Sequence, residues 1–382
     1  MNIGVLSERA SSESRVCLTP AGARNLVLRG HRVVVESGAG ALARFGDEEY
    51  QDAGAWVVYD REEVFGRSDL ALKVSQLKGS EAEWLREGQA VMAFHHMAAV
   101  GRDLVDDLRS RGATLIGYEV IEDSQGDLPI LHAMSEIAGQ LAVHVGAHYL
   151  ETRAGGRGIL LGGGTGIPPA HVVILGAGVV GLWAGRIAAG NRAQVTLLDS
   201  SVTALRRVEA ALGRGVITEV ADPRAIARAA AYADVLIGAV LMRGEKAPNL
   251  VTRDMVEGMK RGSVIVDVSI DQGGCVETSR PTTLEDPIYV ESDVTHYAVP
   301  NMSSAVARTA SLAMTHALLP FVTALADQGV ETALRDDPAL RAGVYTYRGE
   351  LVSEGVARTF NMPCQKICEL VGSPDYPGNI YA

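Results

Sequence analysis

Several residue types and patterns are scarce in this sequence of 382 residues. Its only cysteines are scattered at positions 17, 275, 364 and 368, which favours reduced thiols in a cytoplasmic protein over a disulfide scaffold. Cys364 and Cys368 have no second Cys or His pair nearby, so we expect no metal site. The chain does not open with a basic stretch and a long apolar run, and residues 172–184, the longest apolar stretch, are too few to cross a bilayer. We therefore expect neither a signal peptide nor a membrane partner.

Positive charge is also in short supply. The chain has 35 Lys and Arg against 46 Asp and Glu, a net charge of −11. An acidic chain repels nucleic acid and anionic membranes, so we expect no nucleic-acid partner. Hydrophobic residues make up 47% and charged residues 21%, as in soluble globular proteins, and the length suggests two or three domains.

Apolar runs that look like strands alternate with helix-like segments along the chain. The expected strands are residues 3–6, 32–36, 70–74, 90–94, 114–118, 172–175, 194–198, 235–238 and 264–268. This alternation predicts an α/β protein with largely parallel sheets.

Two long helices, expected at residues 135–152 and 304–328, flank a glycine-rich centre. We expect the chain to leave one α/β domain by the first helix and return by the second. The prediction is two Rossmann-like, doubly wound domains joined by long helices, with a ligand cleft between them. A substrate domain would comprise residues 1–135 and 310–382, and a nucleotide domain residues 136–309.

The strongest local motif starts at the expected strand 172–175. Gly176, Gly178 and Gly181 form G-x-G-x-x-G, a helix follows, and a second strand ends in Asp199. These glycines permit a tight turn, close approach of the backbone to a pyrophosphate, and close helix packing. The pyrophosphate would lie at the helix N-terminus, and Asp199 would accept hydrogen bonds from the ribose. The acid favours NAD, although residues 200–206 leave NADP use open.

Four ionisable residues lie within or just after expected strands and turns: Arg15, Lys73, His96 and Asp271. Ligands of open α/β sheets bind outside the carboxyl ends of strands. A dehydrogenase acting on a keto or amino acid needs cations for the carboxylate, a His to exchange a proton and an acid to orient it. Each residue also has a purely structural interpretation, as a packed or solvated side chain.

Long stretches of the sequence resemble the alanine dehydrogenase/transhydrogenase α-subunit family, and alanine dehydrogenases most closely. The matching segments include SERASSESRVCLTPAGARNLVLRGHRVVVESGAG, MSEIAGQLAVHVGAHYL, GAGVVG, IGAVLMRGEKAPNLV, VIVDVSIDQGGC and PNMSSAVARTAS. They occur in order over nearly the whole chain. The resemblance implies reversible oxidative deamination of an amino acid to a 2-oxo acid and ammonia, and a homohexamer.

The resemblance also implies residue roles. Arg15 and Lys73 would hold the carboxylate and carbonyl oxygen of the substrate, His96 would be the general acid/base, and Asp271 would complete the proton relay. The residues that match cofactor-lining positions, besides the glycines and Asp199, are Ser135, Val179, Val240, Leu241, Val268, Asn301 and Met302.

The sequence departs from the family pattern at several positions. After Lys73-Val74, the residues Ser75-Gln76-Leu77 stand where the family usually has Lys-Glu-Pro. His95 replaces an apolar residue, His132 and Ala133 stand where the family tends to have Ala and Pro, and the tail 364–382 differs. The two histidines are either packed or solvated, or they line a pocket remade for a larger or acidic amino acid.

Two other functions stay open. One is reductive amination that joins an amine to a keto acid, as in opine dehydrogenases. The other is a non-catalytic, transhydrogenase-like NAD-binding subunit.

Overall fold

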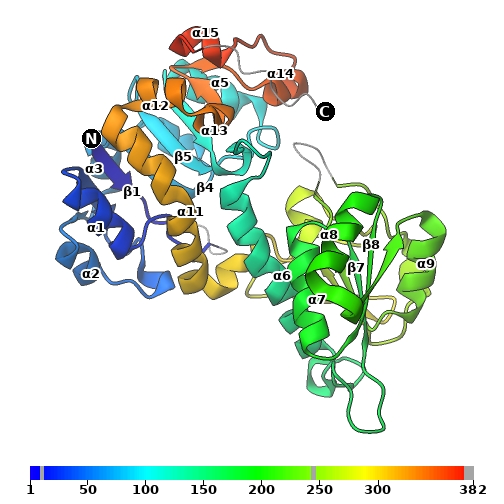
Figure 1. Ribbon diagram of the computed structural model, residues 1–382. Coiled ribbons are helices and arrows are strands. Elements are labelled where there is room, and N and C mark those ends of the chain that lie inside the picture. Colours follow the sequence, from blue (N-terminus) through cyan, green and yellow to red (C-terminus); the bar gives the residue numbers. More distant parts are fainter. Residues whose placement is uncertain (9–12, 242–246, 374–382) are drawn as a thin grey trace. The chain divides into compact units, whose positions relative to one another are not determined.

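The computed structural model describes residues 1–8, 13–241 and 247–373 (Figure 1). Parts of the quoted motifs and the end of the divergent tail lie outside the described residues. The chain divides into two compact units, each with its own sheet. Unit 1 comprises Met1–Met134 and Val306–Ala382, and unit 2 comprises Ser135–Ala305. The domain boundaries expected from the sequence stay a prediction.

The described part of unit 1 is built on an eight-stranded sheet with the order β15-β14-β6-β5-β4-β1-β2-β3. Its strands are β1 (Asn2–Val5), β2 (Arg32–Glu36), β3 (Trp56–Val58), β4 (Leu70–Ser75), β5 (Ala90–Phe94), β6 (Thr114–Gly117), β14 (Val344–Tyr347) and β15 (Glu350–Leu351). Strands β1 to β6 run parallel, whereas β14 and β15 pair antiparallel at one edge. Because β1 pairs with both β2 and β4, the strand order reverses there, which is where open sheets place ligands.

The described part of unit 1 also contains ten helices. They are α1 (Pro20–Leu28), α2 (Asp47–Asp52), α3 (Arg61–Arg67), α4 (Gly79–Ala82), α5 (Arg102–Ser110), α11 (Ala307–Gln328), α12 (Val330–Asp336), α13 (Pro338–Ala342), α14 (Glu354–Phe360) and α15 (Ile367–Val371). Short 3-10 turns lie at η1 (Ala41–Ala43) and η2 (Tyr118–Val120).

Segment Met302–Gln328, which contains α11, is long and apolar enough to cross a membrane by length and composition. Core helices of water-soluble proteins meet the same criterion. The buried face of α11 carries Ser311 and Thr315, whose hydroxyls accept the backbone N–H groups of Val16 and Thr19 at 2.9 Å each. Within unit 1, α11 thus packs on the segment that follows β1.

The described part of unit 2 is built on a seven-stranded sheet with the order β12-β13-β11-β10-β7-β8-β9. The strands are β7 (His171–Leu175), β8 (Gln194–Asp199), β9 (Val216–Val220), β10 (Val235–Gly238), β11 (Val264–Asp267), β12 (Ile288–Glu291) and β13 (Val294–Tyr297). All neighbours pair parallel except β12 with β13. Strand β7 lies between β8 and β10, so the order reverses there, and the glycine-rich loop follows this strand.

The helices of unit 2 are α7 (Val179–Gly190), α8 (Val202–Leu212), α9 (Pro223–Tyr232) and α10 (Arg253–Glu257), with 3-10 turns η3 (Thr152–Ala154), η4 (Gly213–Gly215), η5 (Val268–Gln272) and η6 (Met302–Val306). Helix α6 (Pro129–Tyr149) runs through the boundary between the units.

The fold class expected from the sequence is confirmed: two α/β units with mainly parallel sheets. Every expected strand is present within one residue at each end. The first long helix was placed too late, because α6 begins at Pro129, and proline is well suited to the first turn of a helix. The second long helix is split into η6 and α11.

Candidate active site

The glycine-rich loop of unit 2 connects β7 to α7, and each of its glycines meets a different constraint. Gly176 has a φ of +112°, and a Cβ there would lie 2.3 Å from the carbonyl oxygen of Ala239. A Cβ at Gly181 would lie 1.9 Å from the carbonyl oxygen of Gly176. These two positions require glycine because the backbone passes too close for any side chain.

Gly178 differs from its neighbours, since a Cβ there would meet nothing within 4 Å. Gly178 is the N-cap of α7, whose first N–H groups point out of the helix without intrahelical partners. The protein itself does not need glycine at this position, and the missing side chain leaves the helix N-terminus open. This space and the exposed N–H groups fit a pyrophosphate.

Asp199, the last residue of β8, is held firmly beside this loop. Its Oδ2 accepts the N–H of Ala177 at 2.6 Å, and its Oδ1 accepts the N–H of Ser201 at 2.7 Å. A carboxylate has about four acceptor positions, so each oxygen retains capacity for a ribose hydroxyl. The loop and the acid predicted from the sequence therefore lie together.

The segments that follow β10 and β11 also lie at the carboxyl end of the unit 2 sheet, beside the glycine-rich loop. Ser269 accepts the N–H of Val240 through its Oγ at 2.9 Å, and Asp267 accepts the N–H of Ser269 at 3.1 Å. Burial raises the pKa of Asp267. Val268 is half-buried and Leu241 is 53% exposed, so Leu241 offers an apolar surface.

Asp271 and Asn301 are joined directly. Asp271 is exposed on η5, and its Oδ1 accepts the N–H of Asn301 at 2.9 Å. Asn301 has a φ of +53°, in the left-handed region that Asn tolerates better than most residues. Met302 is buried at the start of η6, and Ser135 is half-buried on α6.

In unit 1, Arg15 is buried and oriented by its near neighbour Glu13. Its Nε and Nη2 donate to the two carboxylate oxygens of Glu13 at 2.7 and 2.5 Å. The guanidinium carbon lies 5.9 Å from the centre of the Phe94 ring, at the end of β5. This two-point pairing fixes the plane of the guanidinium.

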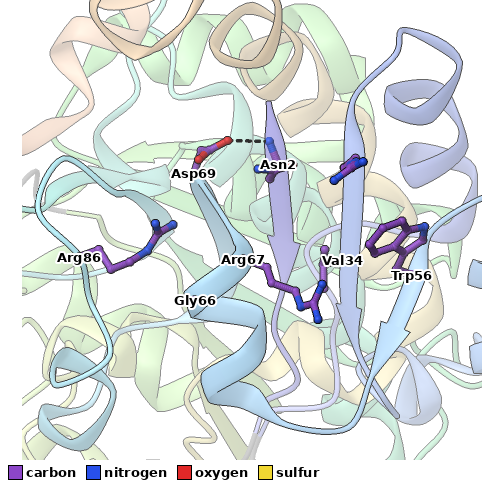
Figure 2. A pocket seen from close by; sticks show the side chains of 8 residues that line it. Asn2, Val34, Trp56, Gly66, Arg67, Asp69 and Arg86 are labelled. Carbon is purple, nitrogen blue, oxygen red and sulfur yellow. Dashed lines mark hydrogen bonds between the residues drawn. The ribbon is translucent and has the colours of Figure 1, made fainter.

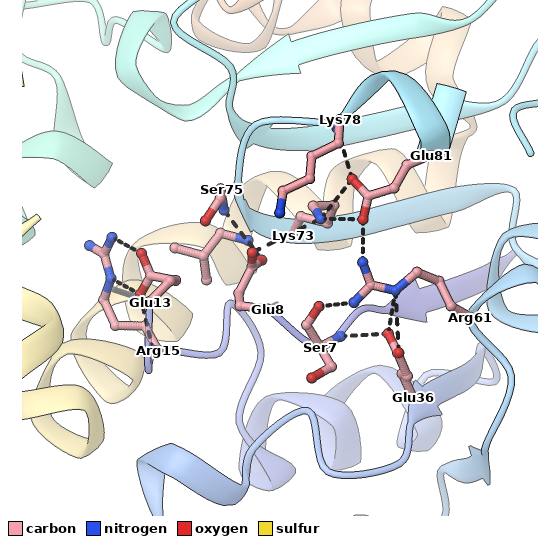
Figure 3. A network of polar contacts seen from close by, with 11 residues as sticks. Ser7, Glu8, Glu13, Arg15, Glu36, Arg61, Lys73, Ser75, Lys78 and Glu81 are labelled. Carbon is pink, nitrogen blue, oxygen red and sulfur yellow. Dashed lines mark hydrogen bonds and ion pairs between the residues drawn. The ribbon is translucent and has the colours of Figure 1, made fainter. Parts of the chain in front are cut away.

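Lys73 lies in a buried charged cluster made of Glu8, Glu36, Arg61, Lys73 and Glu81 (Figure 3). Its Nζ is 2.8 and 3.0 Å from the oxygens of Glu81 and 4.0 Å from Glu8. Arg61 pairs with both Glu36 and Glu81. The Lys73 ammonium, assigned to the substrate from the sequence, thus already has carboxylate partners in its own unit.

The carboxylates of this cluster respond differently to their surroundings. Burial opposes ionisation of Glu81, but Lys73 and Arg61 outweigh it and lower the pKa of Glu81. Burial raises the pKa of Glu8 despite the nearby Lys73 ammonium. The Lys73 ammonium therefore stabilises the ionised form of Glu81 more strongly than that of Glu8, because it lies closer to Glu81.

Lys78 follows β4 and was not singled out from the sequence. It is exposed, and no carboxylate in the described part of the chain forms an ion pair with its ammonium. Figure 3 shows its side chain extending back toward Ser75, the last residue of β4. Only its backbone N–H joins the charged cluster, by donating to Glu81 at 2.9 Å.

His96 and His95 adjoin in sequence but lie in opposite environments. His96 is exposed after β5, and its ring stacks on Phe94 with 6.0 Å between centres. His95 is fully buried, its Nε2 lies 3.3 Å from the carbonyl oxygen of Val91, and burial lowers its pKa to about 4. His95 is therefore packed inside unit 1, which favours the first of the two interpretations left open by the sequence. His132 is half-buried on α6.

Unit 1 also has a hollow of about 290 Å³ at the opposite, amino-terminal end of its strands (Figure 2). Its lining includes Arg32, Arg67 and Arg86. Each of these cations has a neighbour within the unit: Arg32 stacks on Trp56, Arg67 pairs with Glu63, and Arg86 donates to the Ser68 carbonyl. Ligands of open sheets bind at the carboxyl ends, so we do not assign the substrate to this hollow.

Comparison with known proteins identifies the family. Residues 4–138 match the family described as alanine dehydrogenase/PNT, N-terminal domain, and residues 142–354 match its C-terminal domain. The chain belongs to the alanine dehydrogenase/PNT family. The resemblance stated from the sequence motifs is thereby confirmed.

Individual members of the alanine dehydrogenase/PNT family match over nearly their whole length. The alanine dehydrogenase of Halomonas elongata is 45% identical over 97% of this chain and 100% of its own. A solved L-alanine dehydrogenase is 43% identical, with a TM-score of 0.90 over 94% of this chain and 99% of that one. The transhydrogenase of Sinorhizobium meliloti is 26% identical, with a TM-score of 0.80 over 92% and 100%.

Proposed function

We propose that this protein is an NAD-dependent L-alanine dehydrogenase, which interconverts L-alanine with pyruvate and ammonia. The observation that carries the proposal is the 45% identity to an alanine dehydrogenase over 97% of the chain. The exposed His96 after β5 and the oriented Arg15 after β1 support it. By family resemblance we also propose a homohexamer, which a mass measurement in solution tests.

The residues of unit 2 fit NAD. Gly176, Gly178 and Gly181 shape the loop, and the N-terminus of α7 would bind the pyrophosphate. Asp199 would accept the ribose hydroxyls and repel the 2′-phosphate of NADP. The nicotinamide would supply the hydride acceptor. Other residues proposed to line the cofactor are Ser135, Val179, Val240, Leu241, Val268, Asn301 and Met302.

Arg15 is proposed to bind the substrate carboxylate, because Glu13 holds its guanidinium plane in a fixed orientation. For the carbonyl oxygen, the geometry favours Lys78 over Lys73. The Lys73 ammonium is 2.8 Å from Glu81 and 2% exposed, whereas the Lys78 ammonium is exposed and forms no ion pair with a described residue. Lys73 would then have a structural role, since its ion pair with Glu81 stabilises the carboxyl end of β4.

His96 is proposed as the general acid/base. An imidazole titrates near neutral pH, so it can accept a proton from the attacking water during deamination and return it during amination. Asp271 is the proposed acid of the relay, and its bond to the N–H of Asn301 fixes its orientation.

The test is a spectrophotometric assay at 340 nm of 2-oxo acids with ammonium and NADH. The panel contains pyruvate, longer and acidic 2-oxo acids, NADPH in place of NADH, and an amine in place of ammonium. We expect pyruvate, ammonium and NADH to give the highest kcat/KM. His96→Ala and Asp271→Asn should each abolish turnover while NADH still binds.

Other outcomes of this assay would overturn the proposal. Faster turnover with an amine than with ammonium would indicate the opine-type reaction. Folded protein that binds NADH but turns over no 2-oxo acid would indicate a non-catalytic subunit. Preference for an acidic 2-oxo acid would refute alanine as the substrate.

A further inference from the structure

The backbone at His96 has an unusual conformation. Its φ is +46°, in the left-handed region that costs free energy for any residue with a Cβ. Such a conformation persists only where surrounding groups hold it, and it often marks a functional position. The neighbouring groups that hold this peptide therefore decide where the imidazole points.

Glu119 is the residue that engages this peptide. Its Oε1 accepts the N–H of His96 at 2.6 Å and the hydroxyl of Tyr345 at 2.8 Å. Glu119 lies in η2 directly after β6, His96 directly after β5, and Tyr345 in β14. Because these strands are neighbours in the order β14-β6-β5, the sheet itself brings the three residues together.

The surroundings of Glu119 fix how it interacts. Burial, and then Glu119 itself, raise the pKa of Tyr345, so the tyrosine stays a protonated donor at neutral pH. The pKa of His95 is lowered to about 4 by burial, so this neighbour is uncharged. Burial also raises the pKa of Tyr118, the residue before Glu119, so its hydroxyl stays protonated. The Oε2 of Glu119 is buried without a hydrogen bond to a described residue.

We propose that Glu119 is the positioning residue of the catalytic histidine: it holds the strained His96 peptide by one hydrogen bond and favours the imidazolium that forms during catalysis. Tyr345 in turn orients Glu119. The proposal rests on the proposed function only through the role of His96. It adds a residue to the reaction that does not touch the substrate.

Three substitutions separate the hydrogen bond from the charge. Glu119→Gln keeps an oxygen that accepts from both donors but removes the charge. Glu119→Asp keeps the charge but is one methylene too short to reach both donors, and Glu119→Ala removes both. Glu350→Ala, at an exposed carboxylate on β15 of the same unit, is the matched control.

We expect Glu119→Ala and Glu119→Asp to lower kcat at least tenfold with little change in the KM for pyruvate. The orientation of His96 matters for the transition state more than for substrate binding. Glu119→Gln should restore kcat to within about threefold of the wild type, and its acidic kcat–pH limb should move down by roughly half a unit. Glu350→Ala should match the wild type. Wild-type kcat in Glu119→Asp, or failure of Glu119→Gln to restore kcat, would overturn the proposal.

A second readout does not need turnover. The pKa of His96, followed by NMR of histidine-labelled protein with His96→Ala for assignment, should fall by roughly half a unit in Glu119→Gln. If the wild type has no dehydrogenase activity, the proposed function fails, but this shift still tests the role of Glu119. An unchanged His96 pKa in the folded Glu119→Gln variant would refute the electrostatic part.

Discussion

In each unit, the candidate site residues lie near the point where the strand order of a parallel sheet reverses, but the two sites are built from different chemical groups. In unit 2, the candidate site in the loop Gly176–Gly181 depends on backbone groups and on the absence of side chains at its glycines, and Asp199 accepts hydrogen bonds from backbone N–H groups. In unit 1, the corresponding end carries charged side chains that mostly bind one another. A backbone site can be read from glycine spacing alone, whereas a charged site depends on partners that are distant in sequence.

The largest expected effect concerns the two lysines after and within β4. Lys73→Met removes the only cation paired with the buried Glu8 among the described residues and leaves Glu81 with Arg61 alone, and breaking a buried pair costs about 3–5 kcal/mol. Lys78→Met removes an exposed side chain, so stability should change by less than about 0.5 kcal/mol. The KM for pyruvate should instead rise about tenfold, roughly 1.4 kcal/mol of binding.

Urea unfolding and steady-state kinetics of both variants check this prediction. A stable Lys73→Met variant with a raised KM would return Lys73 to the substrate role assigned from the sequence.

The next effect concerns pH and the buried His95. Its pKa is about 4 in the folded protein and near 6.5 in the unfolded chain. Between these two pH values the unfolded chain binds more protons than the folded protein. The stability that comes from keeping His95 neutral is therefore complete above pH 6.5 and is lost as pH falls toward 4. The difference of about 2.5 units corresponds to about 3 kcal/mol.

The apolar substitution His95→Leu should remove this dependence of the free energy of unfolding on pH. Urea unfolding at pH 7.5 and pH 4.5 should show that the wild type loses about 2–3 kcal/mol more than the variant. Parallel pH dependence of the two proteins would show that His95 is not held neutral.

The smallest effect separates two glycines of the unit 2 loop. A Cβ at Gly178 meets no protein atom within 4 Å, so Gly178→Ala should keep its melting temperature and weaken NADH binding about tenfold. A Cβ at Gly181 clashes with the Gly176 carbonyl, so Gly181→Ala should lower the melting temperature as well. Calorimetry and NADH fluorescence titration measure both. Unchanged NADH affinity in Gly178→Ala would contradict the proposed pyrophosphate position.

The sequence predicted the elements that depend on local pattern. Buried parallel strands such as β5 and β10 are continuous apolar runs, and the expected ranges match them. Six strands of the described chain escaped prediction: β3, β9, β12, β13, β14 and β15. Strands β3 and β15 have three and two residues, too few for a pattern, and the other four are short runs in which polar residues interrupt the apolar ones. Glycine constraints at positions 176 and 181 could be inferred because backbone crowding needs no distant partner.

The charged residues were harder to interpret for a physical reason. A lysine within an apolar strand signals a buried anion, but the sequence could not show that the anion is Glu81 rather than a substrate. Glu119 follows a predicted strand as His96 does, so the strand-end rule could have found it. Its link to Tyr345 spans 226 positions and becomes visible only in the sheet.

The central claim is tested most directly by following the hydride. Pyruvate, ammonium and NADH deuterated at the transferable position are incubated with the enzyme, and the products are identified by mass spectrometry and chiral separation. The account predicts L-alanine with one deuterium at Cα, formed only when ammonium is present. Deuterium in lactate or in a secondary amine, or no labelled product from protein that binds NADH, would contradict it.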